Sequence, residues 1–364
     1  MNKVFVAMSG GVDSSVAAAL LAERGEDVVG VWMRLVPSAE SVDAPRCCGT
    51  DEAGEDARRA AGVLGIPFYA LDYADVFGKN VVDRFVHAYS IGETPNPCVS
   101  CNHYVKFEAL MRDVVAKFGA DRLATGHYAR VTHDGGHRLM RARDAAKDQS
   151  YALYMLGQRE LSRLEMPIGD LADKSETRRI AARFGLPTAT KPDSMDICFI
   201  GGDYRGFVRK RAPEAFVPGP VERLDGEVIG EHAGVGTLTV GQRSGTGVAT
   251  GERLYVLRLE TDRRAAIVGT REEIRATSYD LRDVRFTQEP RPEGRFRTDA
   301  VLRYRGTPLA GWVTVNGDRA SLDLDSPALV APGQAAVFYS GDEVIGGGIV
   351  AKGAETPGRE SHTN

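Results

Sequence analysis

The first 35 residues alternate between apolar runs and polar breaks in the order of a strand, a loop, a helix and a second strand. Residues 4–8 form an apolar run of strand length that is rich in β-branched side chains. A Ser-Gly-Gly turn signal follows, and the alanine-rich stretch after Asp13 ends at Gly25, as a helix does. The next apolar run, residues 27–35, predicts the second strand.

Strands and helices continue to alternate up to about residue 89. Residues 51–64 predict a helix with acidic residues early, arginines late and Gly65 as its stop. Residues 67–71 predict a third strand, and residues 75–89 predict another amphipathic helix. This alternation predicts an α/β fold with a doubly wound parallel sheet, whose ligands bind at the carboxyl ends of the strands.

Residues 90–102 interrupt this pattern. Pro95 and Pro97 predict an extended, non-helical loop through this segment. Beyond the loop, the pattern predicts a helix at 105–118, a strand at 122–125, a hairpin that turns at Gly135-Gly136, and a helix at 175–184.

The character of the sequence changes after about residue 215, where short strands are separated by glycine-rich turns. From about residue 276 to residue 351 the pattern is all-β and fits a small barrel of a type that binds nucleic acid. We therefore predict an α/β domain at 1–212, a small β-rich central domain at 213–275, a C-terminal β-barrel at 276–353 and a disordered tail at 354–364.

Composition adds limits on location and partners. The 364 residues are 43% hydrophobic and 26% charged, as in ordinary globular proteins. No apolar run approaches the roughly 20 residues that cross a bilayer, and no signal peptide precedes the first strand, so we expect a soluble, cytoplasmic protein without a membrane partner. The net charge of −4 provides no global attraction to DNA, and RNA would have to bind local basic patches.

The loop after the first strand suits a phosphate group. Its two glycines let the backbone approach an anion, the following helix presents its N-terminal N–H groups, and Ser9, Ser14 and Ser15 add hydroxyls. No Gly-Lys-Ser/Thr follows, which excludes a Walker loop. The order Ser-Gly-Gly-Val-Asp-Ser resembles the pyrophosphate loop of the N-type ATP pyrophosphatases, which activate an oxygen as its adenylate. This resemblance implies that residues 1–212 form a catalytic domain with an adenine nucleotide alpha hydrolase-like fold. The alternative is an ordinary strand-to-helix turn.

The five cysteines are an odd number, which favours metal binding or catalysis over a disulfide framework. Cys98 and Cys101 lie in one loop and Cys198 in another, and both loops offer a nucleophile that could displace an adenylate. Two other interpretations remain. Cys98 and Cys101 are also half of a zinc site that Cys47 and Cys48 could complete, and Cys198 alone could be a small buried hydrophobic residue.

Several motifs in order make the chain resemble the tRNA-specific 2-thiouridylases over about residues 3–210. They are Ser-Gly-Gly-Val-Asp-Ser at 9–14, Thr-Pro-Asn-Pro at 94–97 followed by Cys101 and Asn102, Gly-His-Tyr at 126–128, Lys-Asp-Gln-Ser-Tyr at 147–151 and Ile-Cys-Phe-Ile-Gly at 197–201. Gly-Gln-Arg at 241–243 and Arg-Tyr-Arg at 303–305 also fit. Each motif is weak or moderate alone, but the ordered set is highly specific.

The resemblance implies an enzyme that thiolates the wobble uridine of tRNA, using ATP and Mg²⁺ to adenylate the C2 oxygen of the base. It places ATP on Ala7, Met8, Ser9, Gly10, Gly11, Val12, Asp13, Ser14, Met33 and Gly126. Met33 could equally be a plain core methionine.

The resemblance also implies roles for two cysteines. Cys198 would receive sulfur from a donor or sulfur-relay protein and carry it as a persulfide. Cys101 would act as the nucleophile that releases this sulfur or attacks the activated base, and a Cys101–Cys198 disulfide would then need reduction. A persulfide is more acidic than a thiol, which favours nucleophilic attack at neutral pH.

For the RNA, the resemblance places Asn96, Pro97 and Cys98 beside the target base. The wobble uridine would have to leave its stack, which a single-stranded loop permits. The residues expected to contact tRNA are Lys147, Asp148, Gln149, Arg303, Tyr304 and Arg305. Without the resemblance, these residues could equally form a solvated charged surface.

Cys98 departs from the family pattern, because many members have an aspartate there as a candidate proton acceptor. The extra thiol leaves open a second route, in which Cys98, Cys101 and Cys198 hold three irons of a [4Fe–4S] cluster and one iron binds sulfide. Two other functions remain: another synthetase of the same loop class, which needs no distant cysteine pair, and a non-catalytic RNA-binding or zinc protein.

Overall fold

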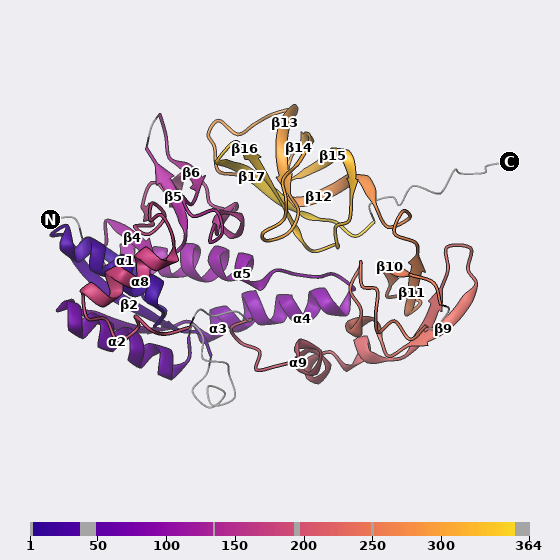
Figure 1. Cartoon of the computed structure of the whole chain (residues 1–364), viewed down its shortest axis with the longest axis horizontal. Coiled ribbons are helices and arrows are strands. Elements are labelled where there is room, and N and C mark those ends of the chain that lie inside the picture. Colours follow the sequence, from indigo (N-terminus) through magenta and orange to yellow (C-terminus); the bar gives the residue numbers. More distant parts are fainter. Residues whose placement is uncertain (1–2, 37–48, 134, 193–196, 249–250, 354–364) are drawn as a thin grey trace.

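The computed structural model describes residues 3–36, 49–133, 135–192, 197–248 and 251–353. Figure 1 shows an α/β part on the left, a β-barrel above the middle and a smaller β-rich part on the right. The helices labelled α4 and α5 extend from the α/β part toward the other two.

The α/β part is built on a five-stranded sheet in the order β3-β2-β1-β4-β7, and all four strand pairs are parallel. The predicted doubly wound sheet is thus confirmed, and its order reverses at β1. The strands are β1 (Lys3–Ala7), β2 (Asp27–Arg34), β3 (Phe68–Asp72), β4 (Arg122–Thr125) and β7 (Leu164–Glu165).

The two faces of β1 contribute to different cores, as the two-residue period of a strand requires. Val4 and Val6 pack with helices α1 and α2 in one hydrophobic cluster, whereas Phe5 belongs to a second cluster that includes Cys101. The helices are α1 (Val12–Glu23), α2 (Asp51–Leu64), α3 (Ala74–Phe77), η1 (Gly78–Val82), α4 (Asp83–Ser90), α5 (Pro97–Ser100), η2 (Cys101–Leu110), α6 (Met111–Phe118), α7 (Gln158–Leu161) and α8 (Lys174–Arg183), with a 3-10 turn η3 (Ser150–Leu153).

The predicted non-helical loop up to Asn102 is wrong in its second half. Helical structure begins at Pro97 and runs through α5, η2 and α6 to Phe118. Proline suits the first turn of a helix because its missing N–H would have no partner there. Asn96 caps this end, since its side-chain oxygen accepts a hydrogen bond from the Cys98 N–H at 3.1 Å.

The C-terminal strands form a closed, antiparallel, six-stranded barrel in the order β12-β15-β14-β13-β16-β17, which the β12–β17 pairing closes. This confirms the predicted barrel. A hairpin of the α/β part, β5 (Ala129–Thr132) and β6 (Arg138–Arg141), extends the barrel sheet where Met140 pairs with Glu343. The barrel strands are β12 (Ala276–Phe286), β13 (Arg295–Val301), β14 (Leu309–Asn316), β15 (Arg319–Ala328), β16 (Ala335–Ser340) and β17 (Glu343–Val350).

The central part has a four-stranded sheet in the order β10-β11-β8-β9. None of the helices in the described ranges is long and apolar enough to span a bilayer. The predicted tail from residue 354 lies outside the described residues. The central elements are α9 (Tyr204–Arg211), η4 (Pro213–Phe216), β8 (Gly219–Glu222), β9 (Val228–His232), η5 (Val235–Thr237), β10 (Tyr255–Glu260) and β11 (Ala265–Gly269).

Two glycines offer a matched test of the α/β packing. A Cβ at Gly126 would lie 2.5 Å from the Ser14 backbone nitrogen, whereas a Cβ at Gly62, within α2, meets nothing within 4 Å. We expect Gly126→Ala to destabilise the protein by about 1–3 kcal/mol. Gly62→Ala should stabilise it by up to about 1 kcal/mol, because alanine favours the helix. Thermal unfolding midpoints would test this, and equal shifts in both variants would contradict the close approach at Gly126.

Candidate functional site

Hydrogen bonds between its own residues order the loop between β1 and α1. The Ser9 N–H donates to the Ser14 hydroxyl at 3.0 Å, and the two serine hydroxyl oxygens lie 3.2 Å apart. Gly10 has a φ of 75°, and a side chain there would collide with the carbonyl of Ala53 in α2. Glycine is therefore required at this turn, where the loop backbone packs closely against α2.

Helix α1 begins at the loop with Gly11 as its N-cap, and no side chain of a described residue caps it there. The first N–H groups of a helix lack intrahelical partners, and the helix dipole is positive at this end. Both features favour an anion. The predicted phosphate loop thus has the strand, turn and helix that its chemistry needs.

Lys174, the first residue of α8, is aimed at the same loop. Its ammonium donates to the two carboxylate oxygens of Asp13 at 2.6 and 2.8 Å, and the Tyr128 hydroxyl donates to Asp13 at 3.0 Å. The hydroxyls of Tyr128 and Thr177 lie 2.8 Å apart. Only 14% of the Lys174 side chain is exposed, so water screens its ion pair with Asp13 little.

Lys191 places a second cation at the loop. Its ammonium donates to the Gly10 carbonyl at 3.0 Å and to Asp56 at 2.6 Å. Burial raises the pKa of the Asp56 carboxyl, but hydrogen bonds from Lys191 and Arg59 outweigh burial and hold the pKa below its ordinary value. The Arg178 guanidinium fixes the lysine's backbone by donating to the Lys191 carbonyl at 3.0 Å.

Sequence analysis missed both lysines. They lie more than 150 residues beyond the loop, and only the packing of α8 against α1 brings them there. The one local signal is the Asp173 N-cap, which fixes where α8, and hence Lys174, begins.

The end of β4 closes the other side of the loop. Gly126 packs directly on the backbone of Ser14 and Asp13, with no room for a side chain. The predicted residue Met33 lies near the carboxyl end of the neighbouring strand β2 and is 9% exposed. Residues 7–14 and Gly126 of the predicted ATP site thus lie together at the ends of β1 and β4, where the sheet order reverses, whereas Met33 lies on β2 and packs in a hydrophobic cluster.

A short series of polar contacts connects this loop region with the cysteine-bearing helix. The Lys106 ammonium donates to the side-chain oxygen of Asn102 at 3.0 Å and lies 3.5 Å from Nε2 of His127. Nδ1 of His127 lies 2.9 Å from the Thr125 hydroxyl at the end of β4. Burial, with a further contribution from Lys106, holds the pKa of His127 well below its ordinary value, so the imidazole is neutral at pH 7. Because Asn102 follows Cys101 in the chain, this series runs from the end of β4 to the start of the cysteine-bearing helix η2.

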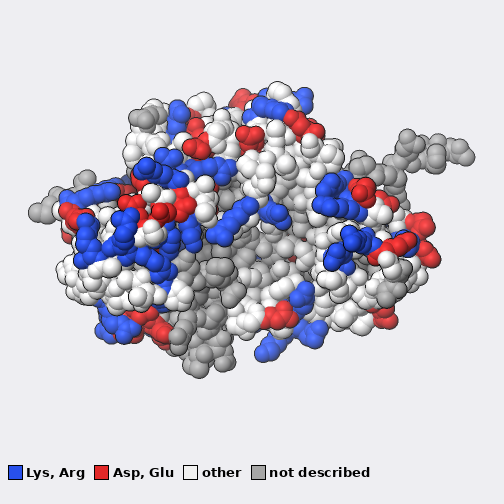
Figure 2. All heavy atoms as spheres, viewed as in Figure 1, with Lys and Arg blue, Asp and Glu red and all other residues white. Residues whose placement is uncertain are grey.

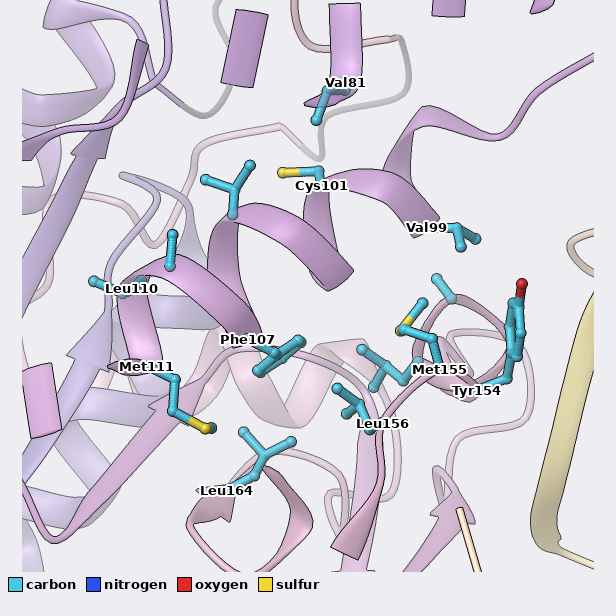
Figure 3. Close-up of a cluster of buried hydrophobic side chains, with 14 of the residues drawn as sticks. Val81, Val99, Cys101, Phe107, Leu110, Met111, Tyr154, Met155, Leu156 and Leu164 are labelled. Carbon is cyan, nitrogen blue, oxygen red and sulfur yellow. The ribbon is translucent and has the colours of Figure 1, made fainter. Parts of the chain in front are cut away.

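The three cysteines differ in exposure. Cys98 is exposed on α5, whereas Cys101 begins η2 and is 8% exposed. Figure 3 shows Cys101 on the same helix as Phe107 and Leu110, within the cluster of buried hydrophobic side chains. Cys198 is intermediate in exposure and packs against the same cluster.

The zinc interpretation cannot be followed at Cys47 and Cys48, which lie outside the described residues. Among the residues that are described, no group of three or more histidine, cysteine, aspartate or glutamate side chains is arranged to hold a metal ion. That search included Cys98, Cys101 and Cys198.

The predicted RNA-contacting segment at 147–149 is largely engaged within the protein. The Asp148 carboxylate accepts hydrogen bonds from Arg141 at 3.0 Å and from the Ser150 hydroxyl at 2.9 Å. Gln149 makes two hydrogen bonds with the backbone of Tyr128. These contacts order the segment, and Lys147 is partly exposed beside it.

A pocket of about 220 Å³ brings this segment together with the predicted Arg303–Arg305 cluster of the barrel. The Arg141 guanidinium lies 3.6 Å from the centre of the Tyr339 ring, and Tyr304 is 38% exposed. The polar and aromatic residues that line the pocket are Arg141, Asp148 and Tyr151 from the α/β part, and Tyr304, Arg305 and Tyr339 from the barrel.

Positive charge is unevenly spread despite the net charge of −4. Figure 2 shows Lys and Arg side chains gathered over the α/β part, at the middle of this face and over the central part. Such local patches are what RNA binding by an acidic protein requires.

The parallel sheet with its glycine loop defines an α/β protein of the HUP class. The family model described as "tRNA methyl transferase HUP domain" matches residues 2–202. The model "tRNA methyl transferase PRC-barrel domain" matches residues 205–270, and "Aminomethyltransferase beta-barrel domain" matches residues 277–350.

Curated relatives match along nearly the whole chain. A protein of Moorella thermoacetica named tRNA-specific 2-thiouridylase MnmA is 45% identical over 96% of this chain and 99% of its own length. Its namesakes in Chloroflexus aurantiacus and Roseiflexus castenholzii are 46% and 43% identical over 97% of this chain and 99% and 100% of their own lengths. The chain belongs to the tRNA-specific 2-thiouridylase family and is therefore an enzyme.

The placement of the cysteines predicts an order of chemical modification. We expect iodoacetamide to alkylate Cys98 faster than Cys101 in the native protein, because Cys98 is exposed and Cys101 is buried in the helix packing. Peptide mass spectrometry over a time course would measure both rates, and guanidinium chloride should abolish the difference. Equal rates in the native protein would contradict the placement of Cys101.

Proposed function

We propose that this protein catalyses the ATP-dependent 2-thiolation of the wobble uridine of tRNA. The observation that carries the proposal is the series Thr125, His127, Lys106 and Asn102, which runs from the end of β4 to the helix that carries Cys101. At its β4 end, Gly126 packs on the backbone of Ser14 in the predicted phosphate loop, so the series supports a site that combines activation with sulfur transfer. The names of the relatives, tRNA-specific 2-thiouridylase, agree with this chemistry.

The loop would activate the base. The phosphates of ATP would lie against the N–H groups at the start of α1, with the hydroxyls of Ser9 and Ser14 beside them. The C2 oxygen of uridine would attack the α-phosphate, and pyrophosphate would leave. Lys174 and Lys191 would neutralise the charge on the departing pyrophosphate by exchanging their contacts with Asp13 and Asp56 for its oxygens. Asp13 is the carboxylate that would hold nucleotide-bound Mg²⁺, which usually takes one or two protein carboxylates and supplies charge neutralisation.

The cysteines would supply the sulfur. A donor or relay protein would leave a persulfide on Cys198, and the Cys101 thiolate would attack the inner sulfur, forming a Cys101–Cys198 disulfide and releasing hydrosulfide. Hydrosulfide would then attack C2 of the base and displace AMP. Alternatively, the terminal persulfide sulfur attacks C2 first and Cys101 then breaks the sulfur–sulfur bond. Either order ends with the same disulfide, which a reductant must open.

Support for the sulfur half comes from packing: Cys101 and Cys198 contact one hydrophobic cluster, although they are 97 positions apart in the chain. The described residues include no side-chain group arranged for a metal ion, so we derive no step through an iron–sulfur cluster. Cys98 distinguishes the two routes, because the iron–sulfur route requires its thiol and the persulfide route does not.

For the RNA, we propose that Asn96, Pro97 and Cys98 flank the target base, since they form the capped start of the helix that carries Cys101. Tyr304 and Arg305, which line the pocket between the barrel and the α/β part, would contact tRNA together with Arg303 and Lys147. Guanidinium groups bind phosphates, and exposed aromatic rings stack on bases. Asp148 and Gln149 would act by shaping this surface. A tRNA substrate also agrees with the predicted cytoplasmic location.

Cysteine variants test the sulfur route. With ATP, Mg²⁺, a persulfide donor and unmodified tRNA, we expect Cys101→Ser and Cys198→Ser to form no 2-thiouridine but to release one equivalent of pyrophosphate. Cys98→Ser should keep thiolation. Nucleoside mass spectrometry of the anticodon loop would measure the product. Normal thiolation in Cys101→Ser would refute its assigned role. A wild-type protein that is active only when loaded with iron, together with a Cys98→Ser variant that stays inactive after the same loading, would favour the cluster.

The two lysines test the nucleotide half. We expect Lys174→Ala and Lys191→Ala each to raise the KM for ATP about tenfold or more, the equivalent of losing about 1.4 kcal/mol from a charged hydrogen bond. The Kd for tRNA should stay unchanged. Lys117→Ala is the matched control, because it removes a cation from an exposed i,i+4 pair on α6. Unchanged ATP kinetics in both loop variants would contradict the assignment.

A further inference from the structure

The segment between α4 and the Asn96 cap lies where all three parts of the protein meet. Residues 91–94 follow α4 directly, and Asn96, Cys98 and Cys101 come next in the chain. Its neighbours include β10 of the central sheet and the turn before β16 of the barrel. A displacement of this segment would therefore also move the proposed target-base residues.

The barrel holds Thr94 by both backbone polar groups. The Thr94 N–H donates to the Pro332 carbonyl at 2.7 Å, and the Gln334 side chain donates to the Thr94 carbonyl at 2.6 Å. Gly333, between them, has a φ of 88°, and a Cβ there would lie 2.9 Å from the Thr94 nitrogen and from the Cβ of Glu93. The two backbones therefore touch without intervening side chains.

An ion pair reinforces this contact. The Arg282 guanidinium of β12 lies 2.7 Å from the Glu93 carboxylate, whose side chain is only 7% exposed. A carboxylate this deeply buried depends on its partner, because removing one member leaves an uncompensated charge.

The central sheet and the end of the barrel complete the junction. Gly92 has a φ of 79°, and a Cβ there would lie 3.0 Å from Cβ of Leu259 in β10. The Lys352 ammonium, just past β17, donates to the Ile91 carbonyl at 2.9 Å and to the Thr261 hydroxyl at 3.1 Å. One lysine thus ties this segment to both β-rich parts.

From these contacts we infer that Glu93 and Arg282 are positioning residues, through which the docked barrel sets the place of Asn96, Cys98 and Cys101 relative to a bound tRNA. Thr94 is two residues from Asn96, and Pro95 between them has a fixed φ, as has Pro97 at the start of α5. A shift of Thr94 is therefore transmitted along a stiff connection to the helix start. This inference rests on the proposed function.

The test uses Glu93→Gln, Arg282→Met and the double variant of the full chain. We expect each single variant to lower kcat for thiolation about 10- to 100-fold, since misplacement by about 1 Å has effects of this size. The Kd for tRNA and the KM for ATP should change less than about twofold. The double variant should be no slower than the slower single variant, because the pair acts as a unit. Arg297→Met, which breaks the exposed Arg297–Asp325 pair of the same barrel, is the control and should leave kcat unchanged.

A second measurement does not depend on activity. The rates at which iodoacetamide alkylates Cys98 and Cys101 should rise in Arg282→Met and stay unchanged in Arg297→Met. Unchanged kcat and unchanged alkylation in both junction variants would overturn the inference, as would a loss found only in tRNA affinity. If the wild-type protein itself forms no 2-thiouridine, the proposed function fails, and the alkylation rates alone then decide whether the barrel positions this segment.

Discussion

The backbone contact between Gly126 and the start of α1 is the constraint on which the site depends. No side chain fits between the end of β4 and the backbone of Asp13 and Ser14. The contact forms where the sheet order reverses, so β1 and β4 diverge into their helices and leave their carboxyl ends open. Gly126 also places His127 beside Lys106 of the cysteine-bearing helix. One glycine thereby links the loop after β1 to the helix that carries Cys101.

The elements that sequence analysis predicted well are those whose signals are local. The apolar run before Ser9, the two glycines and the stop at Gly25 each act within a few residues, and the parallel sheet follows from their repetition. Pro97 was misinterpreted although its signal was also local. A proline in the interior of a helix interrupts it, but a proline in the first turn is favourable. Asn96, directly before Pro97, is also a preferred N-cap residue.

What could not be predicted depends on packing between distant segments. Lys174 and Lys191 reach the loop only because α8 packs on α1, and nothing in their neighbouring residues marks them as loop partners. The pocket that joins Arg141 to Arg305 requires the barrel to dock on the α/β part. A charged residue in a motif, such as Asp148, suggests a contact with a ligand. The Asp148 carboxylate instead accepts hydrogen bonds from Arg141 and Ser150 within the protein.

The two halves of the site are constrained differently, and this difference has a functional consequence. The phosphate loop is fixed within one part of the protein, by β1, α1, α2 and β4, so its geometry does not depend on the barrel. The start of the cysteine-bearing helix is fixed from outside, because Thr94 takes its hydrogen bonds from the barrel. A nucleotide could therefore bind before tRNA, whereas alignment of the cysteines with the base depends on how the barrel is seated. Such a division would restrict sulfur release to the complex in which the base is already in place.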